Sequence, residues 1–531
     1  MFITRPTQCQ GNSDRLADFR CSMLPFAWLE TVTAAWFLVS PKGYPLLKTI
    51  SPSDAQHLRN FLTEAGYAEL PLRKRGCFNE LPSSRLRNMA RLRDFTSEHN
   101  QINTLLRWFW LGLPQEATRV AEFIPAWFTT LALSCGLLSL ESDKLLPEVM
   151  LFPADGFLVP SDHPTKIDAH DPELVLWPNP TSRFLSRFTV RRPSRATLDV
   201  GTGNGIQALL AAAHSQHVVA TDLNPRAVNF AAFTARLNGI ENIEPLLGDG
   251  FTPAAGRKFD LIVSNPPFFI SPSGRYLFCD NPMDLDQLCR KFVKDAPNYL
   301  EEDGYFQLLC EWAEVRDQPW RERIGEWLEN NGCDAWVIKG NTEHPSEYAQ
   351  RRIGETTNDP RQHEELYSTY MAYYQERNVV AIHDGIIALR RRSGHNWIKI
   401  EEMKEMTNDP FGEYVQLAFS ARDFLQSHAQ DEQMMPVKPR LAPYCRLEQF
   451  FEPGEAQWKP TSLNLRLVKG FPFFIGLQAP VAGFLIGCNG NKTISELVGD
   501  FAKQVEAPFE QVQTECLAIL RKLIERGFLL C

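Results

Sequence analysis

The central part of the chain, from about residue 173 to residue 392, alternates short apolar segments with amphipathic ones. The short segments have the length of buried strands, and the segments between them repeat apolar residues every three or four positions, as helices do. This alternation is typical of a parallel α/β sheet. It predicts strands at Thr197–Val200, Val218–Asp222, Ile243–Leu247, Asp260–Ser264, Tyr305–Cys310, Ala335–Ile338 and Ile386–Arg390, with helices at Ile206–His214, Pro225–Leu237 and Trp320–Asn330.

A glycine-rich loop follows the first predicted strand. The sequence Leu198-Asp-Val-Gly-Thr-Gly-Asn-Gly205 puts glycines at alternate positions before a helix begins. Glycine has no Cβ, so the backbone can turn sharply and approach a ligand closely. The spacing G-x-G-x-G differs from the G-x-G-x-x-G that seats the pyrophosphate of a dinucleotide. Asp199, two residues before the first glycine, would repel a diphosphate but attract the ammonium of a methionine moiety.

Acidic residues also follow the next two strands. Asp222 ends the second strand, where a carboxylate can accept hydrogen bonds from both hydroxyls of a ribose. Asp249 follows the third strand in Gly248-Asp249-Gly250, where it could meet an adenine amino group. The carboxyl ends of parallel strands share one sheet edge, which is where open α/β folds bind ligands. Each acid taken alone could instead cap a helix or a turn.

In this order, the loop and the acids resemble the class I S-adenosylmethionine-dependent methyltransferases. The resemblance covers roughly residues 173–392 and implies a Rossmann-like α/β sheet with S-adenosyl-L-methionine as the cofactor. It implies that Asp199 and the glycine loop surround the methionine part, that Asp222 holds the ribose, and that Asp249 or its neighbours hold the adenine. The implied cofactor-binding residues are Asp199, Gly201, Thr202, Gly203, Gly205, Asp222 and Asp249.

The fourth predicted strand ends in Asn265-Pro266-Pro267-Phe268, which carries groups suited to a planar nitrogen. The lone pair of such a nitrogen is conjugated, so the nitrogen is a poor nucleophile. The amide oxygen of Asn265 and the carbonyl of Pro266 could accept its two N–H bonds and draw it towards tetrahedral geometry. Two consecutive prolines restrict the backbone that carries these acceptors, and Phe268 offers a ring for stacking. Alone, the tetrapeptide could be a strand-ending turn.

After the glycine loop, this tetrapeptide resembles the motif of methyltransferases that act on exocyclic amines of RNA or DNA bases, or on the glutamine amide of translation release factors. The resemblance implies N-methylation, with Asn265, Pro266 and Phe268 as catalytic residues and with Asn265, Pro266, Pro267 and Phe268 in contact with the substrate. In-line methyl transfer needs no metal. Two alternatives stay open: a nucleotide-dependent oxidoreductase, which the glycine spacing disfavours, and an inactive binding or scaffold protein on a methyltransferase fold.

The flanking regions predict further domains on either side of the sheet. The capping box Thr493-Ile-Ser-Glu496 and a second helix from about Phe509 to Arg526 indicate a small C-terminal unit, which resembles the PqqD-like and winged-helix class of peptide- or partner-binding modules. The expected parts are an irregular extension at 1–45, a helical or winged N-terminal domain that presents the substrate at 46–172, the methyltransferase domain at 173–395, a linker at 396–440 and a small helical or winged-helix domain at 441–531.

The charge balance limits the partners. Lys and Arg number 55 and Asp and Glu 64, a formal charge of −9, which disfavours indiscriminate binding to phosphate backbones. One local basic run could still contact RNA, although such runs are more often solvated helix faces. Its members are Arg73, Lys74, Arg75, Arg85, Arg87, Arg91 and Arg93. We therefore expect a substrate that is RNA or protein.

Cysteine usage and hydropathy indicate the compartment. The 12 cysteines form no C-x-x-C pair, which predicts no metal site and favours thiols in a reducing compartment. The longest apolar stretch, Met23–Ser40, contains Glu30 and is shorter than the roughly 20 residues of a membrane span. We expect a cytoplasmic protein without a membrane-spanning helix, and we predict no particular oligomeric state.

Overall fold

The computed structural model describes residues 46–77, 85–164, 166, 173–272, 279–357, 359–403 and 410–531. The expected irregular extension at 1–45 lies outside these ranges, and so do the side chains of Arg85 and Arg87 in the basic run. Within the described ranges, no helix combines the length and the hydropathy needed to cross a membrane.

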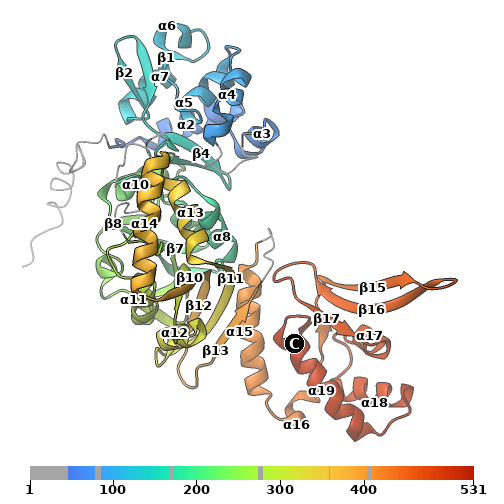
Figure 1. Cartoon of the computed structure of the whole chain (residues 1–531). Coiled ribbons are helices and arrows are strands. Elements are labelled where there is room, and N and C mark those ends of the chain that lie inside the picture. The colour runs from blue at the N-terminus through green and yellow to red at the C-terminus, as the bar shows by residue number, and fades with distance from the viewer. Residues whose placement is uncertain are drawn as a thin grey trace, which may run out of the picture. The chain divides into compact units, whose positions relative to one another are not determined.

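An eight-stranded mixed sheet lies at the centre of the fold, with the order β13-β11-β12-β10-β9-β6-β7-β8 (Figure 1). Strand β12 runs antiparallel to its two neighbours, whereas the pairs between β10 and β8 in this order are all parallel. The mostly parallel Rossmann-like sheet is therefore confirmed, and each of the seven predicted strands falls within one observed strand. The bounds are β6 (Ser194–Val200), β7 (Ser215–Asp222), β8 (Ile243–Leu247), β9 (Phe259–Ser264), β10 (Leu300–Val315), β11 (Cys333–Glu343), β12 (Val379–Arg391) and β13 (Ile398–Glu402).

The strand order creates a crevice at one edge of the sheet. Strand β6 lies between β7 and β9, so the chain leaves β6 towards one side and returns on the other. In the register, Val200 pairs with both Thr221 and Ser264, which brings the carboxyl ends of all three strands together. Open α/β sheets bind ligands at such a switch point.

Helices connect the strands and cover the sheet. Their bounds are α8 (Pro180–Phe188), α9 (Ile206–Ala212), α10 (Pro225–Leu237), α11 (Gln287–Asp295), α12 (Trp320–Leu328), α13 (Pro345–Thr356) and α14 (Pro360–Glu376). Leu209 of α9 and Phe230 of α10 share a core with the N-terminal elements. Phe188 of α8, Phe292 of α11 and Ile324 of α12 belong to a second core with the strands.

The N-terminal elements are helices followed by hairpins. The helices are α2 (Pro52–Glu64), α3 (Glu69–Lys74), α4 (Arg85–Phe95), α5 (Gln101–Phe109), α6 (Ala117–Val120) and α7 (Ala126–Cys135). The short strand β1 (Gln115–Glu116) pairs with a hairpin of β2 (Leu138–Glu141) and β3 (Lys144–Pro147). Strands β4 (Met150–Ala154) and β5 (Phe157–Ser161) form a second hairpin.

The segment 396–440 differs from the expected linker. Strand β13 extends the central sheet by pairing with β11, and Val415 and Phe419 of α15 (Gly412–Ser427) are buried in the same core as the strands. The linker expectation failed because Ile398 and Ile400 alternate with charged residues in a short edge strand. A short polar edge strand looks like a loop in sequence.

The C-terminal elements combine helices with a small sheet. The predicted capping box is confirmed: the Thr493 N–H donates to Glu496 Oε2 at 2.8 Å, and the Glu496 N–H donates to Thr493 Oγ1 at 3.2 Å. A three-stranded sheet was not predicted, because exposed aromatic residues hide the alternation of its strands. The elements are α16 (Asp431–Met434), β14 (Arg440–Leu441), β15 (Cys445–Pro453), β16 (Trp458–Leu467), β17 (Phe474–Leu477), α17 (Ala479–Ile486), α18 (Ile494–Gln504), α19 (Phe509–Glu525) and β18 (Leu529–Leu530).

Candidate active site

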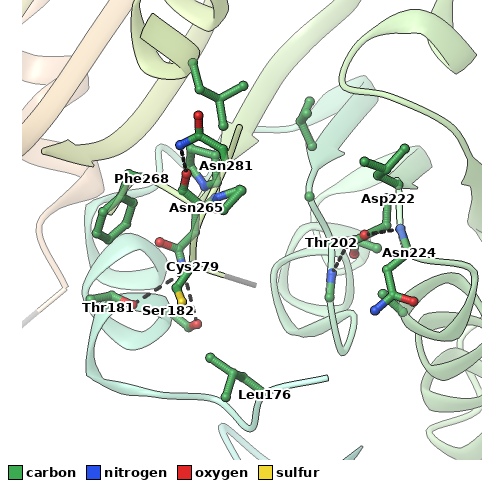
Figure 2. Close-up of a pocket in the computed structure, with 18 of the residues that line it drawn as sticks. Leu176, Thr181, Ser182, Thr202, Asp222, Asn224, Asn265, Phe268, Cys279 and Asn281 are labelled. Atoms are coloured by element: carbon green, nitrogen blue, oxygen red, sulfur yellow. Dashed lines mark hydrogen bonds between the residues drawn. The ribbon is translucent and has the colours of Figure 1, made fainter. Parts of the chain in front are cut away.

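A pocket of about 570 Å³ opens at the switch point of the sheet. Figure 2 shows Asn265, Phe268, Thr181 and Ser182 on one side of this pocket, and Thr202, Asp222 and Asn224 on the other. Every predicted site residue lines it except Gly205. The predicted residues that line it are Asp199, Gly201, Thr202, Gly203, Asp222, Asp249, Asn265, Pro266, Pro267 and Phe268.

The glycine loop lies between β6 and α9 with its backbone exposed to the pocket. Gly201 and Gly203 have φ angles of 74° and 55°, which residues with a Cβ rarely adopt, and a Cβ on either would meet no atom within 4 Å. The open space next to this backbone can admit a ligand. Gly205 serves a different purpose: a Cβ there would lie 3.1 Å from the Cα of Ala231, so the missing side chain lets α9 and α10 pack closely.

Asp199 lies beneath this loop at the end of β6. Its Oδ2 accepts hydrogen bonds from Thr202 Oγ1 at 2.7 Å and from the Ala208 N–H at 3.1 Å, so it holds the loop to the start of α9. The residue is 1% exposed. Burial and the nearby charge of Asp222 raise the pKa of Asp199 to about 7.

Asp222 lies at the end of β7 and is joined to the same loop. Its Oδ2 accepts the Gly203 N–H and its Oδ1 the Asn224 N–H, both at 2.9 Å. Burial raises the pKa of Asp222 even though these N–H groups favour the charged form. No Lys or Arg of the described chain forms an ion pair with Asp222 or Asp199. One buried and one half-buried carboxylate without a cation make this side of the pocket suitable for a positively charged ligand.

Asp249 lies farther along the same edge, in the loop after β8. It lines the pocket, and its side chain is exposed. Gly250 and Phe292 lie beside it in the pocket lining and supply an apolar surface. Asp249 is therefore available to a polar group of a ligand at the mouth of the pocket.

Asn265 lies opposite the acids, at the end of β9. Its Nδ2 lies 3.5 Å from Thr181 Oγ1 and 3.4 Å from Ser182 Oγ, both on α8 (Figure 2). The N-cap of α8, Asn179, accepts hydrogen bonds from these two hydroxyls at 2.7 and 3.0 Å and so orients them. The Oδ1 of Asn265 is buried and has no hydrogen-bond partner among the described residues. An amide that is fixed through its nitrogen presents its oxygen as an acceptor.

Asn281 holds the tetrapeptide at the Pro267 carbonyl. Its Nδ2 donates to the Pro267 carbonyl at 2.9 Å, and its Oδ1 accepts the Met283 N–H at 3.0 Å. Phe268 is buried beside Phe269, with ring centroids 5.8 Å apart. Sequence reasoning missed Asn281, because no local motif connects it to a tetrapeptide that precedes it by more than ten residues.

The wall that closes the pocket comes from the segment before α8. Asn204 Nδ2 donates to the Leu176 carbonyl at 2.6 Å, and Asn224 Nδ2 donates to the Glu173 carbonyl at 2.9 Å. Because Asn204 lies in the glycine loop and Asn224 follows β7, the wall and the strand ends are joined directly.

The arginines of the basic run do not line this pocket in the described chain. Arg73 pairs with Glu69, which also pairs with Arg183 of α8. At Arg73 the run therefore makes an ion pair within the protein. Likewise, among the described residues, no cluster of His, Cys, Asp or Glu side chains is arranged to hold a metal ion.

Two family models match the chain. The methyltransferase small domain matches residues 179–313, which include the glycine loop and the tetrapeptide, and a domain of unknown function, DUF7782, matches residues 417–531.

Curated relatives match the same central region. A "Putative protein N5-glutamine methyltransferase" of Methanocaldococcus jannaschii is 32% identical over 143 residues, 25% of this chain and 71% of that protein. The ribosomal protein uL3 glutamine methyltransferase of Bradyrhizobium diazoefficiens is 31% identical over 157 residues, 27% of this chain and 49% of that protein. The release factor glutamine methyltransferase of Escherichia coli is 42% identical over 100 residues, 18% of this chain and 36% of that protein.

The matches and the pocket lead to one family. The chain spans about half of the uL3 enzyme and about a third of the release factor enzyme, and the matched part carries the sheet edge described above. The open backbone of Gly201 and Gly203 and the unpaired carboxylates of Asp199 and Asp222 in the described chain fit S-adenosyl-L-methionine, which has a positive sulfonium and a positive ammonium. The chain therefore belongs to the methyltransferase small domain family of S-adenosylmethionine-dependent methyltransferases.

Proposed function

We propose that the protein is an N-methyltransferase whose acceptor is the planar amide nitrogen of a glutamine side chain in a protein. The observation that carries the proposal is the buried Oδ1 of Asn265, an acceptor that no described residue satisfies, at the edge of the cofactor pocket. A buried polar atom without a hydrogen bond is costly, so a ligand N–H that reaches Asn265 would be bound favourably.

The tetrapeptide would activate this nitrogen by geometry. Asn265 Oδ1 and the Pro266 carbonyl would accept its two N–H bonds, which turns its lone pair out of conjugation and towards the pocket. The prolines keep these acceptors fixed, and Asn281 and the hydroxyls of α8 support them. Holding the two reactants in line can lower the activation free energy by up to about 7–11 kcal/mol. The proton can leave once the methylated nitrogen is acidic, so no dedicated base is needed.

The cofactor supplies an electrophilic methyl group when it is bound. We propose that the glycine loop and Asp199 surround its methionine part, that Asp222 accepts hydrogen bonds from the ribose hydroxyls, and that Asp249 meets the adenine. Each carboxylate oxygen of Asp222 has a second lone pair beyond the N–H it already accepts. The ribose can therefore bind without displacing the loop.

A protein acceptor is favoured over an RNA base by the relatives. Those of Methanocaldococcus jannaschii, Bradyrhizobium diazoefficiens and Escherichia coli are all named for methylation of glutamine. In addition, Arg73 of the basic run pairs within the protein.

Transfer of label into a cell extract tests this proposal. Tritiated S-adenosyl-L-methionine and the protein are added to an extract, which is then treated separately with protease and with ribonuclease. If the acceptor is a protein, we expect precipitable tritium in the extract that protease removes and ribonuclease leaves in place. Label that only ribonuclease removes would show an RNA acceptor, and no transfer into any fraction would contradict N-methyltransferase activity.

A further inference from the structure

The connection between β11 and β12 is a helical hairpin where a tight turn would suffice. The two strands are antiparallel neighbours, and such strands can be joined by two residues. Here helices α13 and α14 fill the connection, and they lie side by side in Figure 1. Because the pairing of β11 with β12 does not require α13 and α14, these helices are available for a role outside the sheet.

Two tyrosines of this hairpin form hydrogen bonds with the backbone of Ile270, two residues after the Asn265–Phe268 tetrapeptide. The hydroxyl of Tyr348 on α13 accepts the Ile270 N–H at 3.1 Å, and the hydroxyl of Tyr374 on α14 donates to the Ile270 carbonyl at 2.7 Å. Ile270 itself is fully buried, in one core with both tyrosines. Both polar backbone groups of one residue are therefore held by side chains of the hairpin.

A buried ion pair ties the hairpin to the sheet and to the same segment. Arg352 of α13 pairs with Glu311 of β10, and the Tyr348 hydroxyl donates to the same carboxylate. Both charged side chains are less than 10% exposed. The guanidinium of Arg352 stacks on the ring of Phe269, 3.4 Å from its centroid. Arg352 thus connects a central strand with the residue that follows Phe268.

The hairpin makes a second attachment farther along the chain. The Tyr373 hydroxyl of α14 donates to Asp284 Oδ1 at 3.0 Å and accepts the Leu285 N–H at 2.9 Å. Arg377 pairs with the same Asp284 carboxylate. Asn281, which holds the Pro267 carbonyl, lies between the two attachments.

We propose that the α13–α14 hairpin is the positioning element of the acceptor site and that Arg352 is its positioning residue. Its attachments at Ile270 and at Asp284 lie on either side of Asn281, which holds the tetrapeptide at Pro267, so that Asn265 and Pro266 stay where the nitrogen must bind. This inference rests on the proposed function and deepens it. Arg352 contacts none of the three proposed cofactor acids in the described chain, so its loss would slow transfer and leave cofactor binding intact.

Three variants test the role, with two matched controls. Arg352→Gln removes the charge pair and the stacked cation, whereas Arg352→Lys keeps a charge for Glu311 but loses the planar fork. Tyr374→Phe removes a single hydroxyl and is least disruptive to folding. The controls are Arg361→Gln and Tyr367→Phe, which make the same chemical changes on α14 at residues that form no hydrogen bond to the described part of the segment 269–285.

Three measurements are made on each full-length variant: the dissociation constant of S-adenosylhomocysteine by calorimetry, the rate of tritium transfer into protein in cell extract, and backbone hydrogen exchange of the peptide around Ile270. For Arg352→Gln and Tyr374→Phe we expect transfer slowed by about tenfold to a hundredfold, the cost of a misplaced reactant. Exchange should be faster, and the dissociation constant should change less than about twofold. Arg352→Lys should recover part of the rate, and both controls should match the wild type.

Two results would overturn the proposal. One is a wild-type transfer rate in Tyr374→Phe, whether or not Arg352→Gln folds. The other is a cofactor affinity that falls in parallel with the rate, since a purely structural role predicts that. If the wild type transfers no label, the proposed function fails, and hydrogen exchange then decides alone: unchanged exchange in Tyr374→Phe would show that the hairpin does not hold the segment.

Discussion

Asp222 is the residue whose side chain connects the glycine loop with the proposed ribose site. Asp222→Ala removes the acceptor for Gly203 N–H and the proposed ribose acceptor together. A hydrogen bond to a charged group contributes about 1.5–3 kcal/mol, so affinity for S-adenosylhomocysteine should fall by roughly tenfold to a hundredfold. Calorimetry measures this, with Glu244→Ala on β8 as a control for the loss of a carboxylate. An unchanged dissociation constant in Asp222→Ala would contradict the assignment.

Asp199 should make cofactor binding depend on pH. Its pKa is raised from 3.8 to about 7 by burial, so below pH 7 the carboxyl is largely protonated in the free protein. An ammonium ligand favours the ionised form, so affinity for S-adenosylhomocysteine should rise between about pH 5.5 and 7 and then level off. Asp222, whose pKa is also raised, titrates in the same sense. Calorimetry across this range measures the slope, and Asp199→Asn should flatten it; an equal slope in that variant would exclude Asp199 as its cause.

The raised pKa of Asp199 has the opposite effect on the free energy of unfolding, which falls as pH rises. The folded protein binds a proton that the unfolded chain has released above about pH 4, so ionisation of Asp199 lowers the free energy of unfolding as pH rises towards 7. Cofactor binding therefore matters most for stability near neutral pH.

At the scale of elements, the close approach of α9 and α10 depends on Gly205. Its φ is 88°, and a Cβ would press on Ala231. Gly205→Ala should lower the free energy of unfolding by about 1–3 kcal/mol for the backbone strain alone, and the steric contact should add to this. Gly256→Ala is the matched control, since its φ is 77° but its Cβ would meet nothing. Denaturant unfolding measures both; equal losses would show that the packing against Ala231 is unimportant.

The sequence predicted the elements whose pattern is local. Strands β6 to β9 are compact apolar runs, and the glycine loop, the acids and the tetrapeptide are each set by adjacent residues. The α13–α14 hairpin was not predicted, because its buried face includes Tyr348, Arg352 and Tyr374 and carries too few aliphatic residues to form a stripe. Asn281 and the hydroxyls of α8 reach Pro267 and Asn265 only through tertiary packing, which no local pattern records.

At the scale of the whole molecule, a buried ion pair between α10 and the residue after β5 supports the pocket wall: Arg226 also donates to the Glu173 carbonyl, and Asp162 also accepts the Val175 N–H. Arg226 of α10 pairs with Asp162 through both guanidinium nitrogens, and neither side chain is more than 2% exposed. Burial would raise the pKa of Asp162, but Arg226 holds it below its usual value. Arg226→Met should destabilise the fold by about 3–5 kcal/mol, because a buried charge loses its partner.

Chemical denaturation measures that loss, and the double variant Asp162→Asn with Arg226→Met serves as its control. The double variant should recover part of the stability, since no buried charge is then unpaired. A single Arg226→Met variant as stable as the wild type would show that the pair does not hold the wall.

The proposed N-methyltransferase activity is tested most directly by following one labelled methyl group in the wild type and in Asn265→Ala. Both proteins should bind S-adenosylhomocysteine with equal affinity, because we propose that Asn265 binds the acceptor and not the cofactor. Only the wild type should transfer tritium from S-adenosyl-L-methionine into protein at full rate, and the variant should be slower by about a hundredfold or more. Equal transfer by the two proteins, or failure of the wild type to bind the cofactor product, would contradict the account.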